Sequence, residues 1–246
     1  MHRIKLTVAY DGTAYCGWQV QPNGTSVQSV LQAAVEALVG GKINLTGASR
    51  TDSGVHALGQ VAIFDTDMDL DPRQFARAIN VRLPEDIVVQ ESCEVPIDFH
   101  PRYAKIRKTY SYRVLNSSVP NPFLRRYSLF YPSRLDLQAM QEAAAILTGR
   151  HDFRSFSSKK PDVGSTVRTI ESLTLERRGD LITLRVSGDG FLYHMVRILA
   201  GTLLKVGRGQ KNITDIRQAL RNPRFQAAGP TAPARGLLLE KIEYLE

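Results

Sequence analysis

The chain has 246 residues, of which 43% are hydrophobic and 23% are charged, a composition that excludes disordered and fibrous classes of protein. Its length accommodates two lobes of about 100 to 130 residues each. The formal net charge of +8 favours an acidic partner such as a nucleic acid.

Three features of the sequence bear on its compartment. The first residues, MHRIKLTVAY, alternate apolar and polar side chains and lack the apolar core of a signal peptide. The most apolar later segment, residues 190–207, is interrupted by His194, Arg197 and Lys205, which argues against a membrane span. Cys16 and Cys93 lie far apart without a CxxC pair, as two reduced thiols would. The sequence therefore predicts a cytoplasmic protein with no membrane contact.

The first part of the chain alternates between strand and helix patterns. Residues 3–10 have the period of two that is typical of a half-buried strand, and the helix that follows has Ser26 as its N-cap. Glycine ends that helix, and Pro72 lies in the first turn of the next. The predicted order is βαββαβ, comprising a strand at 3–10, a helix from Ser26 to Gly40, strands near 43–49 and 58–65, a helix from Asp71, and a strand at 86–95.

The second part is predicted to repeat that order. It contains a strand at 108–115, a helix from Asp136 to Gly149, a hairpin over 167–190 turning at 178–180, a helix at 190–206, a helix at 213–221 capped by Thr214, and a final strand at 236–245. The predicted fold class is α+β, with two ferredoxin-like (split βαβ) lobes at 1–103 and 104–246. Their antiparallel sheets, covered by helices on one face, are expected to flank a basic active-site cleft.

A basic and aromatic segment runs from Phe99 to Arg134 and contains no Asp or Glu. Such a mixture can neutralise phosphates and stack on bases. The same composition also fits a solvent-exposed basic edge whose aromatic residues lie in the core. Its eight cations are Arg102, Lys105, Arg107, Lys108, Arg113, Arg125, Arg126 and Arg134. Its aromatic residues are Phe99, Tyr103, Tyr110, Tyr112, Phe123, Tyr127, Phe130 and Tyr131.

The most suggestive motif is GASRTDSGVHALGQ, residues 47–60. Asp52 stands before Gly54, which permits a tight turn that presents the carboxylate, and Arg50 lies two residues away. An ionised aspartate can serve as nucleophile, base or electrostatic stabiliser, but Asp-Ser-Gly is also an ordinary turn. The five histidines include no closely spaced metal-binding pair. The residues alone therefore indicate a carboxylate site in a basic protein, with no metal.

Residues 49–60 resemble the signature of the TruA family of tRNA pseudouridine synthases. Three further segments resemble the same family in the same order, namely residues 7–23, 99–114 and 191–209. Ser49 and Ser53 depart from residues common in the family, but neither removes a functional group.

The resemblance implies an isomerase that converts uridine to pseudouridine at positions 38, 39 and 40 in the anticodon stem and loop of tRNA, with no cofactor. It implies that Asp52 is the catalytic nucleophile and that Arg197 is a catalytic partner which keeps it ionised. Tyr110 is expected to bind substrate by stacking on the target uracil, and Arg50 by contacting the nucleotide that flips out. The resemblance also implies a homodimer whose partner is the tRNA anticodon arm.

Several alternatives stay open. The carboxylate can attack the sugar carbon, add to the uracil ring or take a sugar proton. A noncatalytic RNA-binding protein would retain tRNA binding without product, and a different uridine-modifying enzyme would act on RNA lacking an anticodon arm.

Overall fold

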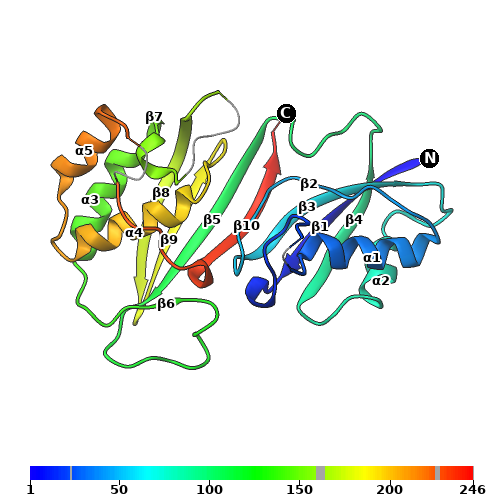
Figure 1. Cartoon of the computed structure of the whole chain (residues 1–246), viewed down its shortest axis with the longest axis horizontal. Helices are drawn as coiled ribbons and strands as arrows, with labels where there is room; N and C mark the ends of the chain where they lie inside the picture. The colour runs from blue at the N-terminus through cyan, green and yellow to red at the C-terminus, as the bar shows by residue number, and fades with distance from the viewer. Residues whose placement is uncertain (23, 159–163, 225–227, 246) are drawn as a thin grey trace. The chain divides into compact units, whose positions relative to one another are not determined.

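The computed structural model describes residues 1–22, 24–158, 164–224 and 228–245. The chain divides into two compact units (Figure 1), one comprising Met1–Ile106 with Leu238–Glu246 and the other Arg107–Leu237. Each unit combines helices with mainly antiparallel strands. The prediction of an α+β protein with antiparallel sheets is therefore confirmed.

The first unit is built on a sheet with the order β4-β1-β3. Its central strand β1 is antiparallel to both neighbours, so that Leu6 lies opposite Ala62 on one side and Ser92 on the other. Two short pairings extend the outer edge of β3, antiparallel with β2 and parallel with β10. The strands are β1 His2–Tyr10, β2 Thr46–Gly47, β3 His56–Thr66, β4 Ile87–Val95 and β10 Leu237–Tyr244.

Alternation of buried residues explains how the helices of this unit are placed. Ile4, Leu6, Val8 and Tyr10 are buried along β1, and Figure 1 shows the two α-helices packed along the sheet. The first helix begins at the predicted N-cap, where the Ser26 hydroxyl accepts the Ser29 N–H, and it ends at a left-handed glycine. The helices are η1 Gly12–Ala14, α1 Val27–Val39 and α2 Phe75–Asn80.

The second helix of this unit is shorter than the sequence predicts. It begins at Phe75 rather than Asp71. The Asp71 carboxylate accepts the Arg73 N–H at 2.9 Å, and its carbonyl accepts the Gln74 N–H at 2.8 Å. These bonds close a separate turn, because an aspartate side chain competes with helical pairing of the backbone.

The second unit is built on a sheet with the order β5-β9-β8-β7, and β6 pairs with β5. The predicted hairpin is confirmed, with Arg178 opposite Leu181 across its turn. Tyr110 lies opposite Val186 in the pairing of β5 with β9. The strands are β5 Ile106–Leu115, β6 Leu129–Phe130, β7 Gly149–Asp152, β8 Val167–Arg178 and β9 Leu181–Gly188.

Two helix starts in the second unit differ from prediction. The helix expected at 190 begins at Met195, because His194 has a left-handed backbone with φ 61° that a right-handed helix excludes. The helix at 213–221 is capped by Asn212, whose side chain accepts the Asp215 N–H, and not by Thr214. The helices are α3 Leu137–Leu147, η2 Arg154–Phe156, α4 Met195–Gly207, α5 Ile213–Arg221 and η3 Ala234–Gly236.

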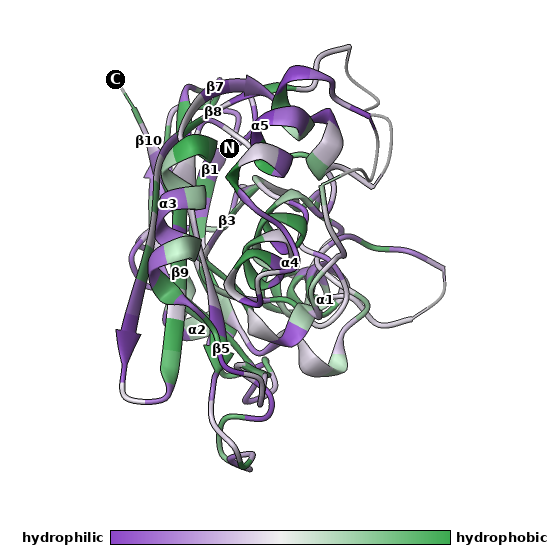
Figure 2. Ribbon diagram, turned by 90° about the vertical axis from the view of Figure 1, so that its left-hand side faces the viewer, coloured by the Kyte–Doolittle hydropathy of each residue, from purple (hydrophilic) through white to green (hydrophobic). Residues whose placement is uncertain are grey.

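The last two α-helices differ in character. Most of α4 is buried, whereas Ile216 is the buried residue that α5 contributes, and Figure 2 shows hydrophilic residues along much of α5. Thus α4 belongs to the core of the second unit and α5 covers its surface.

The final strand differs from the predicted division of the chain at 103/104. The sequence predicts that residues 236–245 complete the second lobe, but Leu238 and Leu239 pair with His56 and Ala57 of β3. Residues from Leu238 onward consequently belong to the first unit. Leu239 is fully buried, and this burial stabilises the pairing.

A cross-strand ion pair in the first unit gives a pH-dependent prediction. Arg3 Nε and Nη2 donate to the two carboxylate oxygens of Asp65 at 2.7 and 2.8 Å, and this bonding lowers the pKa of Asp65 below its ordinary 3.8. Asp65→Asn is expected to lower the free energy of unfolding at pH 7 by about 1 kcal/mol, allowing for solvent screening. A carboxylate with a depressed pKa stabilises the fold above pH 3.8, and this contribution is lost as the pH falls through the folded-state pKa.

Thermal melts between pH 3 and pH 7 measure this effect. The matched control is Asp67→Asn, which removes a carboxylate that is 83% exposed and is expected to change stability less. Equal losses in the two variants, or a loss for Asp65→Asn that is no smaller at pH 3 than at pH 7, would contradict the ion-pair explanation.

Candidate active site

Asp52 lies in the connection between β2 and β3. The Val55 N–H donates to the Asp52 carbonyl at 3.1 Å, and Gly54 has φ +76°, which confirms the predicted glycine-dependent turn. Asp52 itself is half-buried, while the preceding Thr51 is buried. The turn therefore fixes the backbone of Asp52 and leaves this residue partly exposed to solvent.

The loop after β1 anchors both sides of this turn. Before Asp52, the Thr51 carbonyl accepts the Trp18 N–H at 3.1 Å, and the Thr51 hydroxyl hydrogen-bonds to the Tyr10 hydroxyl at 2.7 Å. After Asp52, the Tyr15 carbonyl accepts the Gly54 N–H at 3.3 Å and the Ser53 hydroxyl at 3.2 Å. Such support from a second element is what a preorganised catalytic group requires.

The approach of this loop leaves no room for a side chain at Gly17. A Cβ placed there would lie 2.5 Å from the Thr51 carbonyl oxygen, and the residue has φ +105°. Gly17 therefore permits both the contact and its backbone conformation.

Buried polar side chains fix the strands that lead into and out of the turn. The Gln60 amide donates to the Ser49 carbonyl at 2.7 Å and accepts the Ser49 N–H at 3.2 Å. His56, which is 4% exposed, accepts the Gly12 N–H through Nδ1 at 3.1 Å and lies 3.1 Å from the Asp11 carboxylate. Ser49, Gln60 and His56 thus support the loop.

Arg50 is exposed on the same connection. A second arginine, Arg102, donates from Nε to the carbonyl of Gly47 at 2.7 Å. Partial burial lowers the pKa of Arg102, and the charge of Arg50 lowers it further. Two guanidinium groups therefore share this side of the aspartate loop.

The second unit carries the other two residues predicted for the site. Tyr110 on β5 is 6% exposed, and its ring meets Phe191 edge to face at 5.3 Å between centroids. Arg197 on α4 donates from Nε to the Ala232 carbonyl at 2.7 Å, and its own carbonyl accepts the Ala232 N–H at 3.1 Å. Both side chains are thus held by neighbours within their unit.

Asp52 and Arg50 accordingly lie in the first unit, and Tyr110 and Arg197 lie in the second. Sequence reasoning assigned no site role to Arg102, although the segment from Phe99 to Arg134 includes it. The signal that could have found it is its position beside two aromatic residues, His100 and Tyr103, just before β5. The role of the loop after β1 as the support for Asp52 is visible only in three dimensions.

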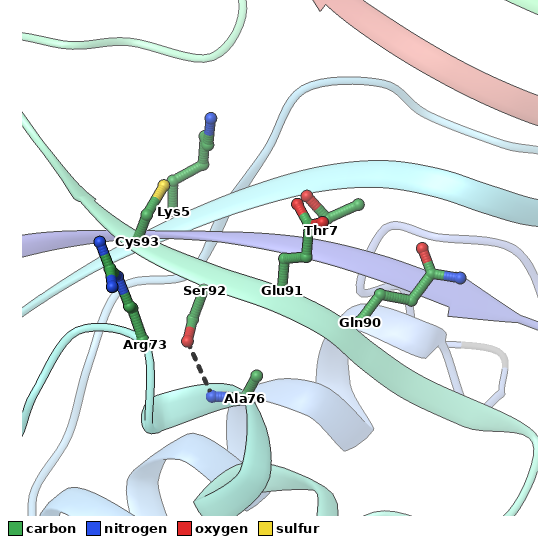
Figure 3. Close-up of a pocket in the computed structure, with 8 residues that line it drawn as sticks. All are labelled: Lys5, Thr7, Arg73, Ala76, Gln90, Glu91, Ser92 and Cys93. Atoms are coloured by element: carbon green, nitrogen blue, oxygen red, sulfur yellow. Dashed lines mark hydrogen bonds between the residues drawn. The ribbon is translucent and has the colours of Figure 1, made fainter.

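A pocket of about 320 Å³ lies elsewhere in the first unit, lined by residues of β1, β4 and α2 (Figure 3). Lys5 and Arg73 extend there beside Cys93, and Glu91 is on the same strand. It contains none of the residues predicted for the site. Within the described part of the chain, no group of three or more His, Cys, Asp or Glu side chains is arranged to hold a metal ion, and no helix has the length and apolarity to cross a bilayer.

Comparison with known proteins places the chain in a family. A family model described as tRNA pseudouridine synthase matches residues 6–104 and 143–245. The tRNA pseudouridine synthase A of Geobacter sp. (strain M21) is 45% identical, with 100% of both chains covered. The protein of that name from Citrifermentans bemidjiense is 47% identical, covering 100% of this chain and 99% of that one.

A solved structure titled "Crystal Structure of a Cbf5-Nop10-Gar1 Complex" aligns with 81% of this chain and 54% of that chain, at 13% identity and a TM-score of 0.34. The sequence relationship is far stronger and extends over the whole chain. The chain therefore belongs to the tRNA pseudouridine synthase family.

Proposed function

We propose that this isomerase converts uridine to pseudouridine at positions 38, 39 and 40 in the anticodon stem and loop of tRNA, with Asp52 as nucleophile and no cofactor. The observation that carries the proposal is the placement of Asp52. In a member of this family, its half-buried carboxylate stands on a turn that hydrogen bonds from the loop after β1 fix on both sides.

The reaction explains why one carboxylate suffices. The bond between ribose C1′ and uracil N1 breaks, the base turns, a bond from C1′ to C5 forms, and the C5 proton leaves. Substrate and product are isomers, so no water is consumed, unlike in glycoside hydrolysis with its two carboxylates. As a nucleophile, Asp52 attacks either the sugar carbon or the uracil ring and is released unchanged.

Arg197 and Tyr110 complete the proposed chemistry. A guanidinium beside Asp52 favours the ionised carboxylate, most strongly where water is excluded. Tyr110 stacks on the flipped uracil, which offsets part of the few kcal/mol lost when the base leaves its stack. In this proposal the Tyr110 hydroxyl helps remove the C5 proton, and Arg50 contacts the flipped nucleotide.

We also propose the arrangement that would present these residues to RNA. The proposed arrangement has two ferredoxin-like lobes that flank a basic cleft. The lobe topology is supported in the first unit by β3, which pairs antiparallel with β1 and β2, as in a split βαβ unit. The exposed Arg125, Arg126 and Arg134 supply charge for the phosphates of the anticodon arm. A cytoplasmic homodimer is proposed from the family resemblance.

Transcripts carrying tritium at C5 of a single uridine test this function. The wild-type chain is expected to release label from uridine 38, 39 or 40, because forming the new bond at C5 expels that hydrogen. Binding without release would support a noncatalytic RNA-binding protein instead. Release from RNA that lacks an anticodon arm would overturn the proposed substrate.

Tyr110→Phe separates stacking from proton transfer. The variant retains the ring and its edge contact with Phe191, so its affinity for tRNA is expected to stay within about twofold of wild type. Loss of the hydroxyl is expected to slow label release about a hundredfold, the lower range for an assisting acid or base. Single-turnover release, with the binding constant measured in parallel, gives both values. Unchanged release would remove the hydroxyl from the mechanism.

A further inference from the structure

The turn formed by residues 99–105 is held in place by hydrogen bonds to other elements of the first unit. Arg3 Nη1 donates to the Phe99 carbonyl at 2.9 Å, the Tyr244 hydroxyl donates to the Pro101 carbonyl at 3.2 Å, and the Leu245 N–H donates to the Lys105 carbonyl at 2.9 Å. Strand β1 and the end of the chain thereby fix the turn at three points. Side chains that extend from it are presented by an anchored backbone.

Arg102 extends from this turn toward the loop that carries Asp52. Its Nε donates to the Gly47 carbonyl at 2.7 Å, three residues before Arg50. A guanidinium has five N–H donors in a planar fork, and within the described residues the bond to Gly47 is the one hydrogen bond that the Arg102 side chain forms. One donor therefore orients the group while its Nη donors stay available for a ligand.

Arg50 is exposed three residues beyond Gly47, whose carbonyl binds Arg102 Nε, and the charge of Arg50 lowers the pKa of Arg102 in addition to the effect of burial. Neither guanidinium forms an ion pair with a carboxylate in the part of the chain that the structure describes. A bound anion reduces the repulsion between two neighbouring positive charges. Arginine binds phosphate oxygens through two parallel N–H donors.

The same turn presents an aromatic surface. Tyr103 is 85% exposed, and its ring stacks on that of His100 with centroids 4.2 Å apart and planes 23° apart. Proteins bind single-stranded nucleic acid with positive charges that contact the phosphates and with exposed aromatic rings that stack on the bases.

We propose that Arg102 and Arg50 together bind one phosphodiester of the tRNA strand near the target nucleotide, and that Tyr103, backed by His100, stacks on a neighbouring base. This subsite rests on the proposed function. It assigns Arg102 and Tyr103 as substrate-binding residues and gives Arg50 a phosphate contact.

Arg102→Gln tests the subsite. The amide can still donate to the Gly47 carbonyl, so the fold is expected to persist, whereas the positive charge is lost. We expect KM for tRNA to rise about tenfold with kcat within about twofold of wild type. Each lost phosphate contact is also expected to reduce the slope of log Kd against log salt by about 0.7 to 0.9. Arg77→Gln is the matched control, because it removes an exposed charge from α2, and its KM and slope are expected to equal those of wild type.

Arg102→Lys and Tyr103→Leu complete the test. The lysine variant keeps the charge and is expected to keep the salt slope. The leucine variant is expected to weaken binding about tenfold with no change of slope, since stacking involves no phosphate. Weaker binding of Arg102→Gln with an unchanged salt slope would overturn the phosphate contact and leave Arg102 as a support for β2. The salt dependence of Kd is measured without turnover, so it tests the subsite independently of catalysis. Absence of label release from the wild-type chain would instead refute the proposed function.

Discussion

Asp52→Asn is expected to lower kcat for label release by about a thousandfold or more, because the amide keeps the size of the side chain but is not a nucleophile. The neighbours that hold the turn use backbone atoms and the side chains of Thr51 and Ser53. Affinity for tRNA is therefore expected to stay within a few-fold of wild type, so the defect falls on turnover. Single-turnover release from tRNA labelled at C5, with binding measured in parallel, gives both quantities.

The matched control is Asp69→Asn, which removes one exposed negative charge between β3 and α2 of the same unit. Its turnover and thermal midpoint are expected to equal those of the wild-type chain. Label release by Asp52→Asn at a wild-type rate would show that another group carries the reaction. Parallel loss of turnover and of folding would assign Asp52 a structural role instead.

Gly17→Ala is expected to lower the free energy of unfolding by about 3 kcal/mol. The new Cβ would meet the Thr51 carbonyl oxygen at 2.5 Å from a backbone with φ +105°, which combines overpacking with conformational strain. For a chain of this size the loss corresponds to a fall of about 6 to 12 °C in the thermal midpoint. Because Thr51 precedes Asp52, turnover at a temperature below the midpoint is also expected to fall.

Gly40→Ala isolates the part of this effect that comes from the backbone alone. Gly40 ends α1 with φ +73°, and a Cβ there would have no atom within 4 Å. Its expected cost is about 1 kcal/mol, with turnover unchanged. If the two alanine variants lost equal stability, the contact between Gly17 and Thr51 would contribute nothing, and the proposed coupling to Asp52 would fail.

The regular elements follow from local chemistry, and for that reason the sequence predicts most of them. The alternation of Ile4, Leu6 and Val8 gives β1, and Ser26 with Gly40 bounds α1. The starts of α2 and α4 were missed because single residues, Asp71 and His194, redirect the backbone in ways that periodicity does not reveal.

The assignment of β10 failed for a different reason. Its apolar residues predict a strand but carry no information about its partner, and its pairing with β3 joins residues 182 positions apart in sequence. Nearness in the chain favoured the second lobe, whereas residues from Leu238 onward belong to the first unit. Strand partners depend on contacts that no local pattern contains.

For the site, the sequence supplied residue types and the structure supplied their support. The turn at Gly54 was predictable because Asp, Ser and Gly are residues that favour turns. The hydrogen bonds between this turn and Tyr10, Trp18 and Tyr15 were not, since they join the turn to β1 and to the loop after it, which only folding brings together. Arg102 was hidden among eight cations of equal appearance, and only its bond to Gly47 distinguishes it.

The pairing of β10 with β3 has a consequence for synthesis of the protein on the ribosome. The strand that pairs with His56 and Ala57, directly after the Asp52 turn, is translated only after the whole of the second unit. While the second unit is being synthesised, the edge of β3 beside the Asp52 turn therefore still lacks β10 as its partner. The Asp52 turn thus gains this neighbouring strand only after residues 107–237 have been synthesised.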